Sequence, residues 1–150
     1  GRVRAALPTG RAPRFLASGA HSVWVLSQDD GTITRIDTRR RAVTATIDAG
    51  LAGHGGDIGF GAGNVWATIP GTPLTEIDAA TNQILHRWVG PGGDSLAFGY
   101  GAVWVTDYKN GRVARYALGT FGTRRRATAG GRVFNRACIG QCGERLRDSE

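Results

Sequence analysis

The side chains that could carry chemistry lie in glycine-rich segments between stretches of β-forming sequence. His54 stands in one such segment, which runs into Asp57, while Arg14 and Asp94 end the equivalent segments before and after it. A histidine on an accessible loop can act as a general base or a ligand, because its ordinary pKa lies near neutral pH. We favour a solvated loop position for His54 and turn-capping roles for Asp57 and Asp94. All four residues are kept as candidates for binding a ligand.

Other chemistry finds little support in this sequence. It has no phosphate-binding Gly-Lys-Ser/Thr motif, no His-Glu-x-x-His zinc motif and no nucleophile elbow. Cys138 and Cys142 have three residues between them, and no second pair follows to complete a four-ligand zinc site. We interpret the two cysteines as unpaired thiols, and we predict no metal site and no cofactor.

The charge of the chain raises a nucleic-acid hypothesis, because the net charge is +7 over 150 residues. Residues 117–150 hold 7 Lys and Arg against 3 Asp and Glu, whereas residues 1–116 hold 12 against 9. The excess is concentrated in a Gly- and Arg-rich tail, which we expect to be disordered. The alternatives for this tail are a change of reading frame in the gene and an Arg-rich segment that pairs with nucleic acid or an acidic partner.

The elements that must position the candidate residues follow from a phrase that occurs three times. It is centred on Trp24, Trp66 and Trp104, which are 42 and 38 residues apart, and each tryptophan has a glycine five residues before it. A period near 40 residues belongs to units that cannot bury their apolar face alone and must stack on neighbours. The sequence therefore predicts a repeat architecture around these tryptophans.

Each repeat reads as four short strands joined by tight turns. The strand that carries the tryptophan has apolar residues on both faces, as a strand between two sheets requires. Asp30-Gly31 and Asn110-Gly111 predict two-residue type I′ hairpins. The other strands are predicted at residues 15–18, 57–60 and 95–98 before the tryptophans, 32–37 and 112–116 after the hairpins, and 43–47 and 84–88 at the end of a repeat.

Four strands in about 40 residues, repeated, are typical of β-propeller blades. Residues 3–10 match residues 43–50 position by position, so we expect an orphan fourth strand at the start of the chain. The predicted fold is all-β, a partial propeller over residues 1–116 with this orphan strand and about two and a half four-stranded antiparallel blades. Because closed propellers have at least four blades, we expect a fragment with exposed edges, which favour self-association.

Several charged residues recur at fixed places in the repeats. Arg35, Glu76 and Arg115 fall at equivalent positions of successive third strands. Their alternating sign predicts ion pairs between blades, each worth about 0–1 kcal/mol where exposed. His21 occupies a turn position that is glycine in the other two repeats, and His86 lies in a fourth strand, where we expect it to be exposed.

The repeated text Gly-x-Gly-x-Val-Trp-Val, followed by Asn-Gly-x-Val-x-Arg-Ile-Asp and Thr-x-x-Val-x-Ala-x-Ile, resembles the YVTN-type propeller repeats of bacteria, which are relatives of the NHL propellers. The resemblance covers residues 1–116. It implies a non-enzymatic binding, sensor or scaffold module with a protein or small-molecule ligand at the propeller rim, and it favours a periplasmic or secreted protein. No apolar run reaches the roughly 20 residues of a membrane-spanning helix, so we predict no membrane span.

Two other functions stay open from the sequence. A similarity to streptogramin lyases, another related propeller group, would make His54 a catalytic residue and would imply a divalent metal and an acidic partner. No rim loop shows the His/Glu pairing that such a site needs. The Arg-rich tail would instead support nucleic-acid binding, which the concentration of charge outside the repeats disfavours.

Overall fold

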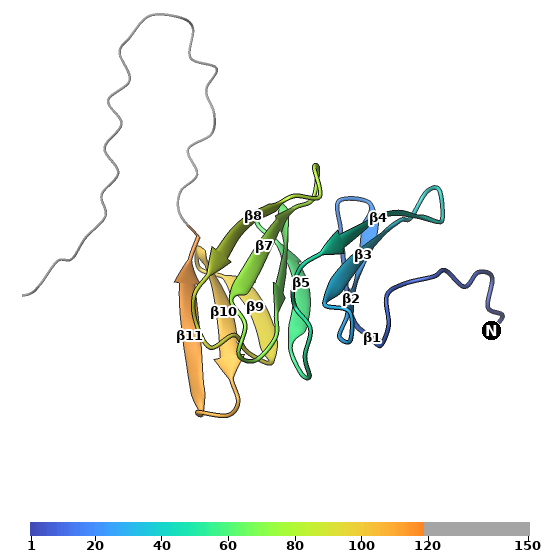
Figure 1. The fold of residues 1–150 in the computed structure, drawn as a ribbon. Helices are drawn as coiled ribbons and strands as arrows, with labels where there is room; N and C mark the ends of the chain where they lie inside the picture. The colour runs from blue at the N-terminus through green and yellow to red at the C-terminus, as the bar shows by residue number, and fades with distance from the viewer. Residues whose placement is uncertain (119–150) are drawn as a thin grey trace, which may run out of the picture. The chain divides into compact units, whose positions relative to one another are not determined.

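The computed structural model describes residues 1–118, which form eleven strands in three antiparallel sheets (Figure 1). Blade A comprises β1 (Pro13–Gly19), β2 (Ser22–Ser27), β3 (Thr32–Asp37) and β4 (Ala42–Asp48); blade B comprises β5 (Asp57–Gly61), β6 (Asn64–Thr68), β7 (Leu74–Asp78) and β8 (Ile84–Trp88); blade C comprises β9 (Ser95–Gly99), β10 (Ala102–Asp107) and β11 (Arg112–Ala117). No helix within residues 1–118 is long and apolar enough to cross a membrane.

The predicted tail starts at residue 117, and of this tail only Ala117 and Leu118 belong to the described residues. Ala117 is the last residue of β11, and the amide of Leu118 donates to the carbonyl oxygen of Gly101 at 2.9 Å. The interpretations of Cys138 and Cys142 lie outside the described residues.

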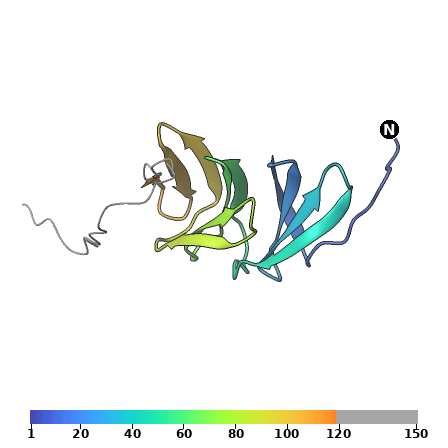
Figure 2. The same ribbon diagram turned by 90° about the horizontal axis from the view of Figure 1, so that it is seen from above.

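The three blades lie side by side, as the view from above shows (Figure 2). Strand β1 packs beside β5, and β5 packs beside β9, so the first strands of successive blades are neighbours. Within each sheet, strands that follow one another in the chain are neighbours. The prediction of an all-β, propeller-type fold is confirmed. Apart from the orphan strand, the strands whose bounds were predicted agree with the observed ones to within two residues at each end.

Each blade has two apolar faces, which we name by the residues of its second strand, β2, β6 or β10. The trailing face is the face to which the tryptophan points. The leading face is the opposite face, to which the residues before and after the tryptophan point. Trp24, on the trailing face of blade A, shares one buried cluster with Val65 on the leading face of blade B. Trp66 of blade B likewise shares a buried cluster with Val103 and Val105 of blade C. The alternation of apolar residues on both faces is thus the pattern by which one blade stacks on the next.

The glycine that precedes each tryptophan has two roles. The indole Nε1 of Trp24 donates to the carbonyl oxygen of Gly19 at 3.2 Å, and the same bond forms in the other two blades. Phe60 of blade B covers Gly19, and Phe98 of blade C covers Gly61. A Cβ atom at either glycine would overlap the ring, so this close approach requires the absence of a side chain.

The hairpins differ from the prediction in their turn type. Gly31 and Gly111 have positive φ, but Asp30 and Asn110 do not, so these loops are not type I′ turns. Four residues, not two, separate the paired strands here, and only the glycine has to be left-handed. Two-residue loops with both φ angles positive occur instead between the first two strands of each blade, at 20–21, 62–63 and 100–101.

The orphan strand predicted at residues 3–10 is not formed: residues 1–9 have no regular secondary structure. A fourth strand depends on backbone hydrogen bonds to a third strand, as β4 pairs with β3. The described residues contain no third strand that belongs to the same unit as residues 3–10. The segment lies instead against blade A, where Leu7 lines a groove together with Leu16.

Candidate ligand-binding site

The loop that carries His54 is held in place from blade A. Gln28 is 5% exposed. Its side-chain Nε2 donates to the backbone carbonyl oxygen of Gly55 at 2.6 Å. Its backbone carbonyl oxygen accepts from the amide of Gly53 at 3.0 Å. Gly53, Gly55 and Gly56 have φ angles of 152°, 79° and 92°, which only glycine adopts readily. The imidazole between them is exposed. The loop thus presents His54 to solvent on a fixed backbone.

The two candidate carboxylates support neighbouring backbone. Asp57 Oδ2 accepts from the amide of Leu96 at 2.9 Å, so the first residue of β5 secures the start of β9 in the next blade. The amide of Asp94 donates to the carbonyl oxygen of Thr106 at 3.0 Å, and its carboxylate packs on the backbone of Gly55, where a Cβ would lie 2.6 Å from Oδ1. Both residues therefore act in the structure as links between adjacent chain segments.

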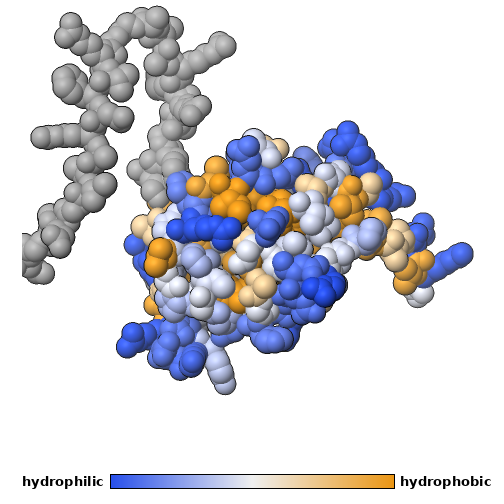
Figure 3. Space-filling view, in the orientation of Figure 1, coloured by the Kyte–Doolittle hydropathy of each residue, from blue (hydrophilic) through white to orange (hydrophobic). Residues whose placement is uncertain are grey.

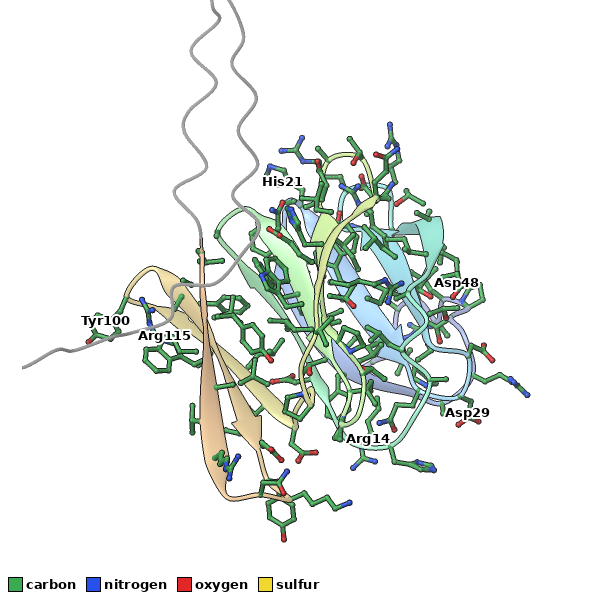
Figure 4. All side chains as sticks on the ribbon, turned by 60° about the vertical axis from the view of Figure 1, so that its left-hand side comes forward. Arg14, His21, Asp29, Asp48, Tyr100 and Arg115 are labelled. Atoms are coloured by element: carbon green, nitrogen blue, oxygen red, sulfur yellow. The ribbon has the colours of Figure 1, made fainter. Side chains whose placement is uncertain are left out.

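Arg14 belongs to a groove on the leading face of blade A. The groove has a volume of about 470 Å³. Its lining consists of Ala5, Leu7, Thr9, Pro13, Arg14, Leu16, Val25 and Ile36. The Arg14 side chain is exposed, and its guanidinium lies 5.4 Å from the ring centroid of Phe15. Figure 4 shows Arg14 near the same end of the blades as Asp29 and far from His21. An apolar floor and one accessible cation therefore meet in this groove.

The four predicted residues do not converge on one site. The His54 loop touches Asp94 through Gly55, and Asp57 bonds to the start of β9, so these three lie at the junction of blades B and C. None of them lines the groove beside Arg14. Within residues 1–118 no three His, Cys, Asp or Glu side chains lie close enough together to hold a metal ion.

Sequence reasoning missed a polar cluster inside blade B. Glu76 is 2% exposed, and its carboxylate accepts from Asn64 Nδ2 at 2.6 Å and lies 3.0 Å from Nδ1 of His86. The ring of His86 is in turn 5.1 Å from that of Trp88, which stacks on Trp66. Glu76 and His86 lie opposite each other in the pairing of β7 with β8. An acidic residue and a histidine in two consecutive predicted strands were the signal that could have revealed the pair. A buried carboxylate is tolerated here because two polar groups satisfy it.

The predicted ion pairs between blades are wrong for the described residues. Arg35 reaches into blade B, but its Nη1 donates to the neutral Oδ1 of Asn82 at 2.9 Å, and its guanidinium lies 4.8 Å from the ring centroid of Trp24. Glu76 bonds within its own blade. Of the three residues, only Arg35 bonds to the next blade, and it does so at the turn between β7 and β8.

A second hollow lies on the basic side of blade A. It has a volume of about 440 Å³ and is lined by Arg2, Val3, Arg4 and Arg41. The arginines come from segments that are far apart in the sequence, which is why the charge pattern alone did not reveal the hollow. Figure 3 shows hydrophobic and strongly hydrophilic side chains close together on the surface of the described residues.

Aspartates at the turn after the third strand have lowered pKa values. Asp78 Oδ1 accepts from the amides of Ala80 and Thr81 at 2.6 and 3.1 Å, and these bonds hold the pKa of its carboxyl below the ordinary value. Asp37 is held in the same way, first by the amide of Arg40. These carboxylates stabilise turns and are not poised for proton transfer.

No protein-family model and no curated protein matches the chain. Among solved structures, it is similar to hydrazine synthase of Kuenenia stuttgartiensis, with a TM-score of 0.51 and 13% identity over 78% of this chain and 40% of that one. Glutaminyl cyclase of Myxococcus xanthus (15% identity, 67% of this chain, 45% of that one) and the computationally designed Ika4 protein (16%, 79% and 99%) match with TM-scores of 0.45. The chain thus spans less than half of the two natural proteins. The similarity to hydrazine synthase supports a β-propeller-type fold alone.

Proposed function

We propose that this chain is a non-enzymatic, propeller-type binding module whose ligand occupies the groove on the leading face of blade A. The observation that carries the proposal is an apolar floor beside an exposed guanidinium. Leu16 is 66% exposed, whereas Ile58, at the equivalent position of blade B, is 4% exposed. The groove thus offers apolar surface of the kind that the blades bury elsewhere, with Arg14 at its edge.

The chemistry of the groove favours a ligand with an apolar body and one anionic group. Burial of apolar surface supplies affinity at roughly 25 cal/mol per Å², and a guanidinium binds carboxylate or sulfonate oxygens with two parallel hydrogen bonds. Binding is favoured over catalysis because Asp57 and Asp94 are engaged with neighbouring backbone. His54 stands apart from the groove.

Titration with anilinonaphthalene sulfonate, an apolar fluorophore with one anionic group, tests this function. We expect Leu16→Asp to weaken binding about tenfold, since it places a charge on the apolar floor. Arg14→Gln removes the guanidinium that binds the sulfonate and should weaken binding by a few-fold, because Arg14 is exposed to solvent. Leu85→Asp, on an exposed position of β8, is the matched control and should bind as the wild type does.

The uncovered face of blade C could bind the same fluorophore, so Val113→Asp is measured alongside. If Val113→Asp removes the fluorescence change and Leu16→Asp does not, the groove is not the binding site and the proposal fails. If both substitutions leave the titration unchanged, the binding is non-specific and the proposal also fails.

A further inference from the structure

The trailing face of blade C repeats the features by which blades A and B receive the next blade. Trp104 Nε1 donates to the carbonyl oxygen of Gly99 at 3.2 Å, as Trp24 does to Gly19. The guanidinium of Arg115 lies 5.7 Å from the ring centroid of Trp104, in the position that Arg35 holds in blade A. Blade C has three described strands where blades A and B have four, and it presents the same glycine, tryptophan and arginine for stacking.

Among the described residues, nothing covers this face. Trp104 is half-buried, whereas Trp24 and Trp66 are both 0% exposed. Val113 is 62% exposed. Ile33 in blade A and Leu74 in blade B occupy the equivalent position and are 0% exposed. No described atom lies within 4 Å of the place where a Cβ at Gly99 would stand.

The interface between blades A and B defines the chemistry that such a face accepts. Phe60 lies on Gly19, and Asn82, from the turn between the last two strands of blade B, accepts a hydrogen bond from Arg35 at 2.9 Å. The interface between blades B and C repeats the aromatic contact, with Phe98 as the ring. β-Branched and small residues of the leading face complete both interfaces.

We propose that the trailing face of blade C binds the leading face of a β-sheet in a protein partner. This sheet supplies an aromatic ring that covers Gly99, β-branched side chains that pack on Trp104, and an amide or carboxylate oxygen that accepts from Arg115. The inference goes beyond the proposed ligand function, because it concerns the opposite end of the described stack of blades.

A second copy of this chain carries the wrong residues for that role. Ser18 stands where blades B and C have the phenylalanines. Arg41 stands where blade B has Asn82: both have positive φ, and both donate their amide to the carbonyl oxygen of the aspartate four residues before. Arg41 would therefore meet Arg115 with like charge. Leu7 also lies on the leading face of blade A, in the way of a second copy.

Restoring the missing chemistry in this chain tests the proposal. Ser18→Phe and Arg41→Asn supply the ring and the amide, and Leu7→Ser loosens the segment that covers the leading face. Two three-bladed units that stack head to tail would form a ring of about six blades, within the usual range. We expect light scattering after size exclusion to show a dimer for the triple variant, with a dissociation constant at least about tenfold below that of the wild type.

The controls separate this interface from other association. Leu7→Ser alone should remain monomeric, and adding Gly99→Leu to the triple variant should dissociate the dimer, because the leucine fills the place of the ring. Circular dichroism verifies that each variant keeps its β signal. A triple variant that stays monomeric, or a dimer that survives Gly99→Leu, overturns the proposal. A wild-type dimer that Gly99→Leu dissociates overturns it too, because a second copy is then the occupant.

Discussion

The ring of Phe98 lies on the backbone of Gly61, so that a Cβ atom at that glycine would overlap the aromatic carbons. Phe60 lies on Gly19 in the same way one blade earlier. The contact explains why a glycine stands five residues before Trp24 and Trp66: its carbonyl oxygen accepts from the indole, and its Cα, which has no side chain, packs against the next blade's ring. Blade stacking in this chain therefore depends on a residue with no side chain.

We expect Gly61→Ala to destabilise the protein by about 1–3 kcal/mol, because the methyl group would displace the ring of Phe98. Gly99→Ala is the matched control, since nothing lies within 4 Å of its Cβ position and the substitution restricts the unfolded chain. Its free energy of unfolding should be unchanged or slightly higher. Urea denaturation of both variants checks this. Equal losses at the two glycines would contradict the ring-on-glycine account.

We expect Asp57→Ala to loosen the start of β9, because the amide of Leu96 loses its acceptor. The cost should be about 1–3 kcal/mol, the usual range for an unsatisfied donor. Hydrogen exchange read by mass spectrometry compares the variant with the wild type. The increase in exchange rate should be larger in residues 95–99 than in residues 15–19. If exchange is unchanged while binding of a ligand is lost, Asp57 is a binding residue and its structural role is wrong.

We expect Glu76 and His86 to be coupled in a double-mutant cycle. Their side chains lie 3.0 Å apart with the carboxylate buried, so His86→Ala leaves Glu76 to Asn64 alone. Glu76→Gln removes the charge that makes this loss costly. The coupling free energy from thermal unfolding of the two single variants and the double variant should be about 1 kcal/mol. Additive effects would show that the contact does not contribute to stability.

We expect the free energy of unfolding to fall as the pH drops through the acid range. Asp37 and Asp78 have folded-state pKa values below their unfolded values, so their contribution is present above a pH of about 4 and is lost as the pH falls through the folded pKa. Asp37→Asn with Asp78→Asn keeps an acceptor in each turn without the titration. The variant's stability should vary less between pH 6 and pH 3. A variant with the wild-type slope would show that other groups set the dependence.

The strands were predictable because each follows from local chemistry. Alternation around the tryptophans and glycines at the turns place β2, β6 and β10 without reference to any other part of the chain. The turn type at Asp30-Gly31 was not predictable from the dipeptide, because Gln28 and Asp29 also leave the ladder and lengthen the loop. Local sequence propensity thus predicts where a strand lies, while the pairing of neighbouring strands determines the type of turn between them.

The candidate sites were less predictable because they depend on contacts between segments. The groove beside Arg14 exists because the residues predicted as an orphan strand lie across blade A. The pairing of Glu76 with His86 depends on the register of β7 and β8, which includes a bulge. Asp57 was assigned to a turn, but its carboxylate reaches the next blade. Each of these relationships requires knowledge of which strand lies next to which.

The trailing face of blade C carries the tryptophan, glycine and arginine of the stacking pattern, and no residue within 1–118 covers it. Hydroxyl-radical footprinting with mass spectrometry measures whether this face is open to solvent, because Trp24, Trp66 and Trp104 occupy equivalent positions within one sample. We expect oxidation of Trp104 and protection of Trp24 and Trp66, which are 0% exposed. Equal protection of all three tryptophans would contradict the claim, since it would show that the face of blade C is already occupied.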